Sequence, residues 1–373
     1  MKRCLLITAS LRIGGAEKVA RDIGMNARKM GYEVDYLVFG DEVCGYEKEL
    51  ENGGCRMIHI PAPSESYSHY MKTLKHLMRE NQYTVVHAHT MFNIGWAMLA
   101  ARQCGVPIRI AHAHSALNNG YGLKKTIYEK LMRSLILRNA TDLVACGDDA
   151  GVRLFGKTAY EKRGKCILNG IDVDRFAFSK EARDRIRSEL RIQDAFVIGH
   201  VGHLASVKNQ SFLIRLLPQI IEKKPNAKLL LLGEGEDRDK LEKLIRDLKL
   251  DNRVIMTGNV RNVPDYLSAM DVFAFPSLFE GMPLSIVEVQ ANGLSCVLST
   301  GVPRDVYFTD LLIPLPLECP DDWAEVVCRA GRREPGRYAS TLKDCGLDTE
   351  AIMRKYTEIY ERAKNFDSNC HTV

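Results

Sequence analysis

The feature that most constrains the fold is a regular alternation of short apolar runs with longer amphipathic stretches. In the first half of the chain, the predicted strands are residues 4–8, 34–39, 57–60, 85–87, 108–111 and 143–145. The predicted helices between them are residues 17–30, 70–80, 94–104 and 125–138. Strands that alternate with helices in this way indicate a parallel sheet with helices on both faces.

The same pattern begins again in the second half. Its predicted strands are residues 196–201, 228–232, 254–256, 272–275 and 296–298, and its predicted helices are residues 211–223, 238–248 and 284–292. A chain of 373 residues is also too long for one ordinary core. We therefore expect an α/β protein with two doubly wound, Rossmann-like domains, 1–175 and 176–348, which face each other across a cleft. A C-terminal helix within residues 349–373 can pack on either domain, including back on the N-terminal one.

Composition narrows the class of protein. The net charge of +5 is compatible with an anionic ligand or a membrane surface, but it is not the strongly basic balance of a nucleic-acid-binding protein. The 11 cysteines form no CxxC pair, which favours reduced thiols in a cytoplasmic protein over a disulfide framework. No run approaches the roughly 20 apolar residues that cross a bilayer, so membrane contact would be peripheral, at the inner face of the cell membrane.

Two glycine-containing turns follow predicted strands. Gly14 and Gly15 precede the first helix, where they allow a bulky ligand to approach the backbone closely. The turn lacks the P-loop and GxGxxG patterns, so a plain glycine turn is the alternative. In the second turn, Gly233-Glu234-Gly235 is followed by Arg238 where a dinucleotide fingerprint has glycine, which argues against a nicotinamide cofactor.

The most informative segment runs from residue 276 to residue 288, directly after a predicted strand. Pro283 suits the first turn of a helix, which would leave Glu280 in the preceding loop and Glu288 inside the helix. The two carboxylates would then flank a helix N-terminus that can hold a phosphate group. A solvated glutamate pair on an ordinary helix is the alternative for such a pair in isolation.

Several motifs occur together and in order along nearly the whole chain. They are Gly14-Gly15-Ala16-Glu17, Val86-His87-Ala88-His89-Thr90, Asn169-Gly170-Ile171-Asp172, Gly199-His200-Val201-Gly202-His203, Lys208-Asn209, Leu232-Gly233-Glu234-Gly235, and Glu280 with Glu288. This set resembles the retaining GT-B glycosyltransferases of family 4. The resemblance implies transfer of a hexose or N-acetylhexosamine, with retention of configuration, from a nucleotide sugar such as a UDP-sugar.

The resemblance also implies roles for individual residues. Glu288 would accept hydrogen bonds from the ribose, Glu280 would accept them from the transferred sugar, and Lys208 would neutralise the leaving diphosphate. The remaining donor-binding residues are expected to be Gly14, Gly15, Asn209, Gly281, Met282, Pro283 and Leu284. His203 stands where most relatives carry arginine, and we expect it to contact the diphosphate partly as imidazolium. Donor affinity would then fall as pH rises through its titration.

Histidines lie in pairs at three strand ends: His87 with His89, His112 with His114, and His200 with His203. Paired histidines suggest zinc, but no carboxylate or cysteine completes a familiar ligand set, and the family needs no obligatory metal or other cofactor. The resemblance places His114 nearest the reaction centre as a catalytic residue beside Glu280 and Lys208. His112 is the alternate for His114 if the register is off by two, and His89 and His112 are expected on the acceptor side. Asp172-Val173-Asp174 resembles a metal-binding DxD motif but falls in an interdomain segment, and we interpret it as structural.

The acceptor implied by the resemblance is a glycan or a polyprenyl-linked intermediate of capsule or exopolysaccharide. A basic helix with Lys124, Lys125, Lys130 and Arg133 suits an anionic membrane surface, although a solvated helix face explains it equally well. Two further functions share the architecture: a UDP-sugar epimerase, and a catalytically silent partner that binds a sugar nucleotide. The spacing of Glu280 and Glu288 favours the transferase.

Overall fold

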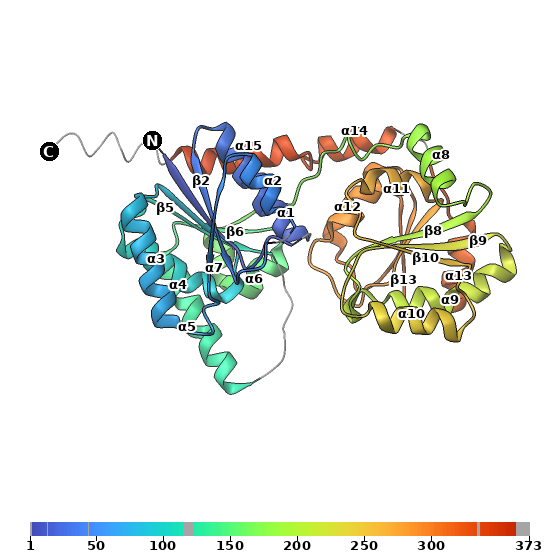
Figure 1. Ribbon diagram of the computed structural model, residues 1–373, viewed down its shortest axis with the longest axis horizontal. Helices are drawn as coiled ribbons and strands as arrows, with labels where there is room; N and C mark the ends of the chain where they lie inside the picture. Colours follow the sequence, from blue (N-terminus) through green and yellow to red (C-terminus); the bar gives the residue numbers. More distant parts are fainter. Residues whose placement is uncertain (1, 13, 44, 115–121, 334–335, 363–373) are drawn as a thin grey trace. The chain divides into compact units, whose positions relative to one another are not determined.

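A computed structural model describes residues 2–12, 14–43, 45–114, 122–333 and 336–362. The chain forms two compact units (Figure 1). Unit 1 contains residues 1–170 together with 349–373, and unit 2 contains residues 171–348. The two segments that pass between the units run side by side, since the Ile171 amide donates to the Leu347 carbonyl at 2.9 Å.

Unit 1 is built on a fully parallel sheet of 7 strands in the order β3-β2-β1-β4-β5-β6-β7. The strands are β1 (Arg3–Ile7), β2 (Glu33–Phe39), β3 (Arg56–Ile60), β4 (Val85–Ala88), β5 (Ile108–Ala113), β6 (Asp142–Ala145) and β7 (Gly164–Cys166). The central strands are buried on both faces, as their continuous apolar runs predict. The strands predicted from sequence in this half are confirmed, and β7 is added at the edge.

The helices of unit 1 are α1 (Gly15–Lys29), α2 (Glu47–Asn52), α3 (Tyr67–Asn81), α4 (Ile94–Gln103), α5 (Leu123–Asn139), α6 (Asp148–Phe155), α7 (Lys157–Arg163) and α15 (Thr349–Glu361), with a 3-10 turn η1 (Met91–Asn93). One sheet face is covered by α1 and α15, whose buried apolar side chains share a single core with β1, β2 and β5. Helices α3, α4 and α5 pack side by side. Of the C-terminal segment, residues 363–373 lie outside the described part of the chain.

Unit 2 is built on a parallel sheet of 6 strands in the order β10-β9-β8-β11-β12-β13. The strands are β8 (Phe196–Val201), β9 (Ala227–Leu232), β10 (Val254–Gly258), β11 (Val272–Phe275), β12 (Cys296–Ser299) and β13 (Leu312–Leu315). The helices are α8 (Lys180–Glu189), α9 (Gln210–Lys223), α10 (Arg238–Asp247), α11 (Val263–Ala269), α12 (Leu284–Ala291), α13 (Pro320–Arg329) and α14 (Arg337–Asp344), with 3-10 turns η2 (Ser206–Lys208) and η3 (Arg304–Val306). Apolar side chains of α9, α10 and α13 form the core with the central strands. Both units therefore have the doubly wound α/β architecture expected from the sequence.

Candidate functional site

The donor-side candidates of unit 2 follow two neighbouring strands, β8 and β11. The strand order reverses between these two, which are hydrogen-bonded to each other although β9 and β10 separate them in sequence. In open α/β sheets, ligands bind beyond the carboxyl ends of the strands at such a reversal. Lys208 lies after β8 and Glu280 lies after β11, so the topology brings both candidates to this point.

Lys208 and Glu280 form a direct ion pair. The Lys208 ammonium donates to Glu280 Oε1 at 2.6 Å, and the same nitrogen lies 5.3 Å from the centroid of the Phe275 ring. The side chains are only 20% and 9% exposed, respectively. Low exposure reduces solvent screening, so the pair fixes a positive and a negative group at the end of β11.

Backbone contacts join the loops that carry these two residues. Asn209 precedes α9 with a left-handed backbone (φ 54°), which asparagine tolerates better than most residues. Its side-chain amide donates to the Pro276 carbonyl at 3.3 Å, and the Leu278 amide donates to the Val207 carbonyl at 2.8 Å. The loops after β8 and β11 are thus held together before any ligand binds.

The start of α12 is arranged almost as the sequence predicts. Glu280 and Gly281 lie in the loop before the helix, and Glu288 lies buried within it, which confirms their predicted secondary structure. Pro283 differs slightly from the prediction, because it caps the helix from outside (φ −70°, ψ 110°) and does not belong to its first turn. The first amides of α12 therefore start at Leu284, and they can donate to an anionic group.

His203 and His200 are separated by the structure. His203 is 62% exposed, and its Nε2 lies 2.8 Å from a carboxylate oxygen of Glu236. The pKa of Glu236 is lowered by a hydrogen bond from its own backbone amide and by the bond to His203. His200 is fully buried against the Ala274 carbonyl and the Gln210 side chain, and burial lowers its pKa to about 4. Only His203 is therefore open to a ligand, and sequence reasoning missed its partner Glu236.

The glycine after β9 is required for the packing of this region. Gly233 has φ 138°, and a Cβ atom at this position would lie 2.0 Å from the Gly202 carbonyl oxygen. Glycine thus allows the turn after β9 to lie against the turn that carries His203. This supports the interpretation of Gly233-Glu234-Gly235 as a structural turn.

In unit 1 the strand order reverses between β1 and β4, and the first glycine turn lies at this point. Gly14 caps α1 in an extended conformation (φ −161°), and Gly15 is the exposed first residue of the helix. A Cβ atom on Gly14 would meet only the flexible carboxylate of Glu17, at 2.4 Å. The backbone here does not demand glycine, although glycine is a favoured residue at a helix N-cap.

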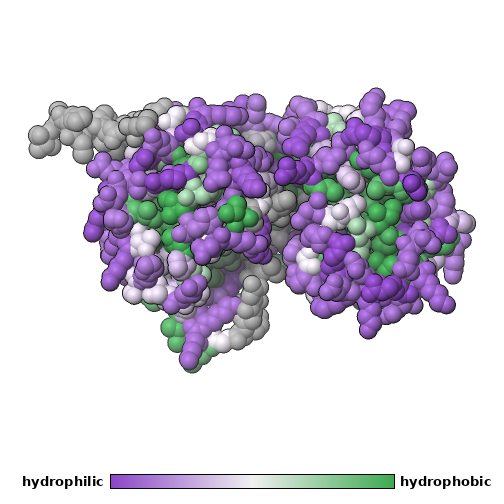
Figure 2. Space-filling view, viewed as in Figure 1, coloured by the Kyte–Doolittle hydropathy of each residue, from purple (hydrophilic) through white to green (hydrophobic). Residues whose placement is uncertain are grey.

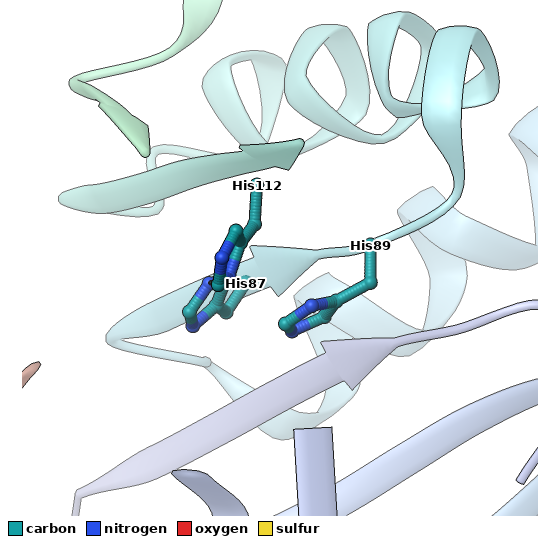
Figure 3. A group of neighbouring side chains, drawn as sticks. All are labelled: His87, His89 and His112. Atoms are coloured by element: carbon teal, nitrogen blue, oxygen red, sulfur yellow. Dashed lines mark hydrogen bonds between the residues drawn. The ribbon is translucent and has the colours of Figure 1, made fainter. Parts of the chain in front are cut away.

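The two histidine pairs of unit 1 meet in one cluster. β4 and β5 are neighbours, and residues two apart on a strand share a face, so all four side chains project to the same side of the sheet. His87 Nε2 lies 3.2 Å from His112 Nδ1, and His89 Nδ1 lies 2.7 Å from His114 Nε2. The two rings that lie on or directly after the same strand stack on each other, with centroids 4.4 Å apart for His87 and His89 and 4.0 Å apart for His112 and His114. Figure 3 shows three of these side chains, with the His87 and His112 rings close together and the His89 ring beside them.

Two tyrosines of α15 complete the cluster. Tyr360 Oη lies 3.1 Å from His87 Nδ1, and Tyr356 Oη lies 3.4 Å from His112 Nε2. His112 is fully buried and both of its ring nitrogens have partners. The tyrosines were missed from the sequence because an aromatic pair four residues apart on an amphipathic helix looks like ordinary core.

Burial dominates the electrostatics of the cluster. Desolvation lowers the pKa of His87 to about 3 and of His114 to about 4, and it lowers the pKa of His89 and His112 well below the usual histidine value. All four imidazoles are therefore neutral at neutral pH. Within the described residues, His89 Nε2 and His114 Nδ1 are buried without a hydrogen-bond partner.

The basic helix α5 has a second apolar face. Met132 and Ile136 are buried, whereas Leu123, Ile127 and Leu131 are 79%, 58% and 51% exposed at a spacing of four residues. In Figure 2, hydrophobic atoms appear among hydrophilic ones at the protruding end of this helix. No helix among the described residues is long and apolar enough to cross a membrane.

The cations of α5 are not equivalent. Lys124 and Lys130 are exposed beside the apolar stripe. Arg133 instead donates to the carbonyls of Leu154 and Arg153 at 3.0 Å and 2.8 Å, and its pKa is lowered by desolvation. The predicted contribution of Arg133 to a membrane-facing surface is therefore not supported, since its guanidinium is occupied within unit 1.

Two family profiles match the chain in sequence. Residues 13–175 match "Glycosyltransferase Family 4", and residues 182–310 match "Glycosyl transferases group 1". The glycosyltransferase EpsF of Bacillus subtilis (strain 168) is 32% identical over 99% of this chain and 98% of its own length. The UDP-Gal:alpha-D-GlcNAc-diphosphoundecaprenol alpha-1,3-galactosyltransferase of Escherichia coli is 30% identical over 74% of this chain and 71% of its own length.

Solved structures agree on the fold. HepE of Anabaena, in complex with UDP-glucose, has a TM-score of 0.74 at 21% identity and covers 96% of this chain and 99% of its own. Sucrose-phosphate synthase of Thermosynechococcus elongatus has a TM-score of 0.77 at 18% identity, with 97% and 99% covered. The two parallel α/β sheets are those of GT-B glycosyltransferases. The chain therefore belongs to glycosyltransferase family 4, and it is an enzyme that transfers a sugar from a nucleotide sugar.

Proposed function

We propose that this enzyme is a retaining transferase that moves a hexose or N-acetylhexosamine from a UDP-sugar to a glycan or polyprenyl-linked acceptor in surface polysaccharide synthesis. The observation that carries the proposal is the Lys208–Glu280 pair at the strand-order reversal of unit 2. Family membership makes transfer the reaction, so the epimerase and the silent-partner alternatives are set aside.

The chemistry explains why a cation belongs at this position. The transition state of glycosyl transfer resembles an oxocarbenium ion, so negative charge accumulates on the departing diphosphate. The Lys208 ammonium and the first amides of α12 form a preorganised positive region that stabilises this charge without rearrangement. Asn209, Gly281, Met282, Pro283, Leu284 and His203 border the same region and complete the proposed donor site.

The carboxylates of Glu280 and Glu288 accept hydrogen bonds from hydroxyl groups of the donor. Glu280 accepts hydrogen bonds from the transferred sugar through the oxygen that Lys208 leaves available, and Glu288 accepts them from the ribose. Within unit 1, His89 and His114 lie at the ends of β4 and β5 as the proposed acceptor-side and catalytic residues. Gly14 and Gly15 lie at the strand-order reversal of the same sheet as proposed diphosphate contacts.

The names of the relatives support UDP and a lipid-linked acceptor. The E. coli relative uses UDP-Gal and an acceptor on diphosphoundecaprenol, and another relative is the capsular polysaccharide biosynthesis glycosyltransferase CapH of Staphylococcus aureus, 24% identical over 96% of this chain and 99% of its own length. A lipid-linked acceptor resides in a bilayer, and α5 offers the matching surface. Leu123, Ile127 and Leu131 insert between lipids while Lys124 and Lys130 contact anionic headgroups.

A thermal-shift screen tests the donor. The purified enzyme is heated with UDP, GDP, ADP and their common sugar conjugates, with and without magnesium. We expect UDP and one UDP-sugar to raise the midpoint without magnesium, since a ligand that binds the native state stabilises it by mass action. A shift with GDP or ADP conjugates alone would replace UDP in the proposal, and transfer with inversion of configuration would refute the retaining step.

A further inference from the structure

The histidine cluster of unit 1 has the composition of a transition-metal site. One nitrogen each of His87, His89 and His112 lies within 4.8 Å of the other two, and all three residues are buried. The three side chains come from neighbouring strands that fix their backbones, and Figure 3 shows the His89 ring beside those of His87 and His112. His114 lies outside this group of three and contacts His89 at 2.7 Å.

The distances suit zinc coordination. Tetrahedral zinc with Zn–N bonds of about 2.0–2.1 Å separates its nitrogen ligands by about 3.3 Å. His87 Nε2 and His112 Nδ1 are already 3.2 Å apart, so an ion can bridge this pair with little movement. A His89 nitrogen lies within 4.8 Å of the ligand nitrogens of the other two residues, so His89 is the third ligand candidate.

The hydrogen-bond arrangement also allows coordination without a change in the number of bound protons. Metal ions bind neutral imidazole through a ring nitrogen that carries no proton. At present one proton lies between His87 and His112. On binding, that proton moves to an outer ring nitrogen that faces Tyr360 or Tyr356, so both inner nitrogens are free to coordinate and the proton count is unchanged.

The tyrosines then act as outer partners of the ligands. Ligating histidines commonly donate their second N–H to an oxygen acceptor, which fixes the ring and its tautomer. Tyr360 and Tyr356 occupy this position for His87 and His112. The buried nitrogens His89 Nε2 and His114 Nδ1, which lack partners among the described residues, give the cluster unused ligand capacity on its other side.

The geometry points to a binding site for one divalent transition-metal ion, with zinc as the favoured ion, formed by His87, His89 and His112. Imidazole ligands select zinc, copper or nickel, whereas magnesium requires oxygen ligands. Occupancy removes His89 from other contacts, including its hydrogen bond with His114. If these residues have the roles given under the proposed function, zinc inhibits sugar transfer.

Direct titration tests the site without reference to activity. The full chain, free of any affinity tag and stripped of metal, is titrated with Zn²⁺ by calorimetry at neutral pH, with Mg²⁺ as the comparison ion. We expect one saturable Zn²⁺ site and none for Mg²⁺. Wild-type protein that is folded by circular dichroism but shows no saturable Zn²⁺ binding overturns the proposal.

Variants locate the site. His112→Gln should abolish tight binding, and Tyr356→Phe, which keeps the packing but removes the outer hydroxyl, should weaken binding by about 10-fold. The matched control is His76→Gln, because His76 is exposed on α3. Equal loss in the His76→Gln control, or unchanged affinity in both cluster variants, places zinc elsewhere and refutes the site.

A transfer assay gives the second readout. With the donor established by the thermal-shift screen, saturating Zn²⁺ should suppress turnover, and a chelator should restore it. Zinc binding with undiminished turnover would leave the metal site intact but contradict the proposed roles of His89 and His114. The two proposals can therefore fail separately.

Discussion

Lys208 and Glu280, which are 72 residues apart in the sequence, are joined by a hydrogen bond of 2.6 Å between Nζ and Oε1. Each side chain is mostly shielded from solvent, so each depends on the other for compensation of its charge. Removing one partner leaves the second charge uncompensated, while removing both relieves this penalty. The pair is thus both a structural link between the loops after β8 and β11 and the proposed centre of donor chemistry.

Substitutions of Lys208 and Glu280 should have non-additive effects on the free energy of unfolding. Lys208→Ala is expected to lower kcat/KM by about 100-fold or more, the usual loss when a preorganised electrostatic contact to the transition state is removed. In urea unfolding, Lys208→Ala and Glu280→Gln should each destabilise the protein, and the double variant should cost less than the sum by about 0.5–3 kcal/mol. Lys243→Ala on the exposed side of α10 is the matched control. Strictly additive stabilities would contradict the coupling.

Glu288 and His114 should separate donor binding from transfer. Glu288→Ala is expected to weaken UDP-sugar binding by about 10- to 150-fold, because a charged hydrogen-bond acceptor contributes roughly 1.5–3 kcal/mol. His114→Ala should leave the donor dissociation constant unchanged and lower kcat. Calorimetry for binding and a transfer assay for kcat check both statements. Equal donor affinity for Glu288→Ala and wild type would remove the ribose role from Glu288.

The fold was predictable from the sequence where apolar runs are long and central. The predicted strands 196–201 and 272–275 coincide with β8 and β11, whose side chains are almost entirely buried. Two edge strands were missed. β7 (Gly164–Cys166) is only three residues long and lacks an apolar run, and β13 (Leu312–Leu315) is apolar but short and contains Pro314, which argues against a strand. The other two edge strands, β3 and β10, were predicted, so local pattern fails where a strand is very short or contains proline.

The residues of the candidate site could be named from the sequence, but the contacts between them could not. The spacing of His87 with His89 indicated that both share a face, yet the order of β4 and β5 was needed to bring His112 and His114 against them. Tyr360 reaches His87 across 273 residues, a separation over which no local pattern operates. Likewise, Glu236 beside His203 depends on the pairing of β8 with β9.

His203 should make donor affinity dependent on pH. An imidazolium contacts the diphosphate more strongly than a neutral ring, so donor affinity is expected to fall from mildly acidic to mildly alkaline pH. Calorimetric dissociation constants of the UDP-sugar across this range provide the measurement. A constant affinity in wild type would exclude the imidazolium contact.

The buried histidines should make the fold sensitive to acid. Their folded pKa values lie below that of an unfolded histidine, about 6.5, so the unfolded chain binds more protons as pH falls. The contribution of the histidines to the free energy of unfolding should be fully present above about pH 6.5 and should decline progressively toward about pH 4. Urea unfolding across this window measures the decline. His87→Gln should flatten the profile, whereas His203→Gln, at an exposed position, should not.

The exposed stripe of α5 should govern attachment to membranes. Ile127→Glu places a negative charge in the centre of the stripe, between Leu123 and Leu131, and should abolish sedimentation with anionic vesicles at low salt. Leu248→Glu is the matched control, since Leu248 is an exposed leucine of unit 2 and its substitution should not alter binding. Lys130→Ala should weaken binding by about 1 kcal/mol, or about fivefold, and only at low salt, because each surface cation contributes about that much and is screened by ions. Failure of the wild-type enzyme to sediment with anionic vesicles would refute a membrane role for this helix, and loss of binding in the Leu248→Glu control would move the contact to unit 2.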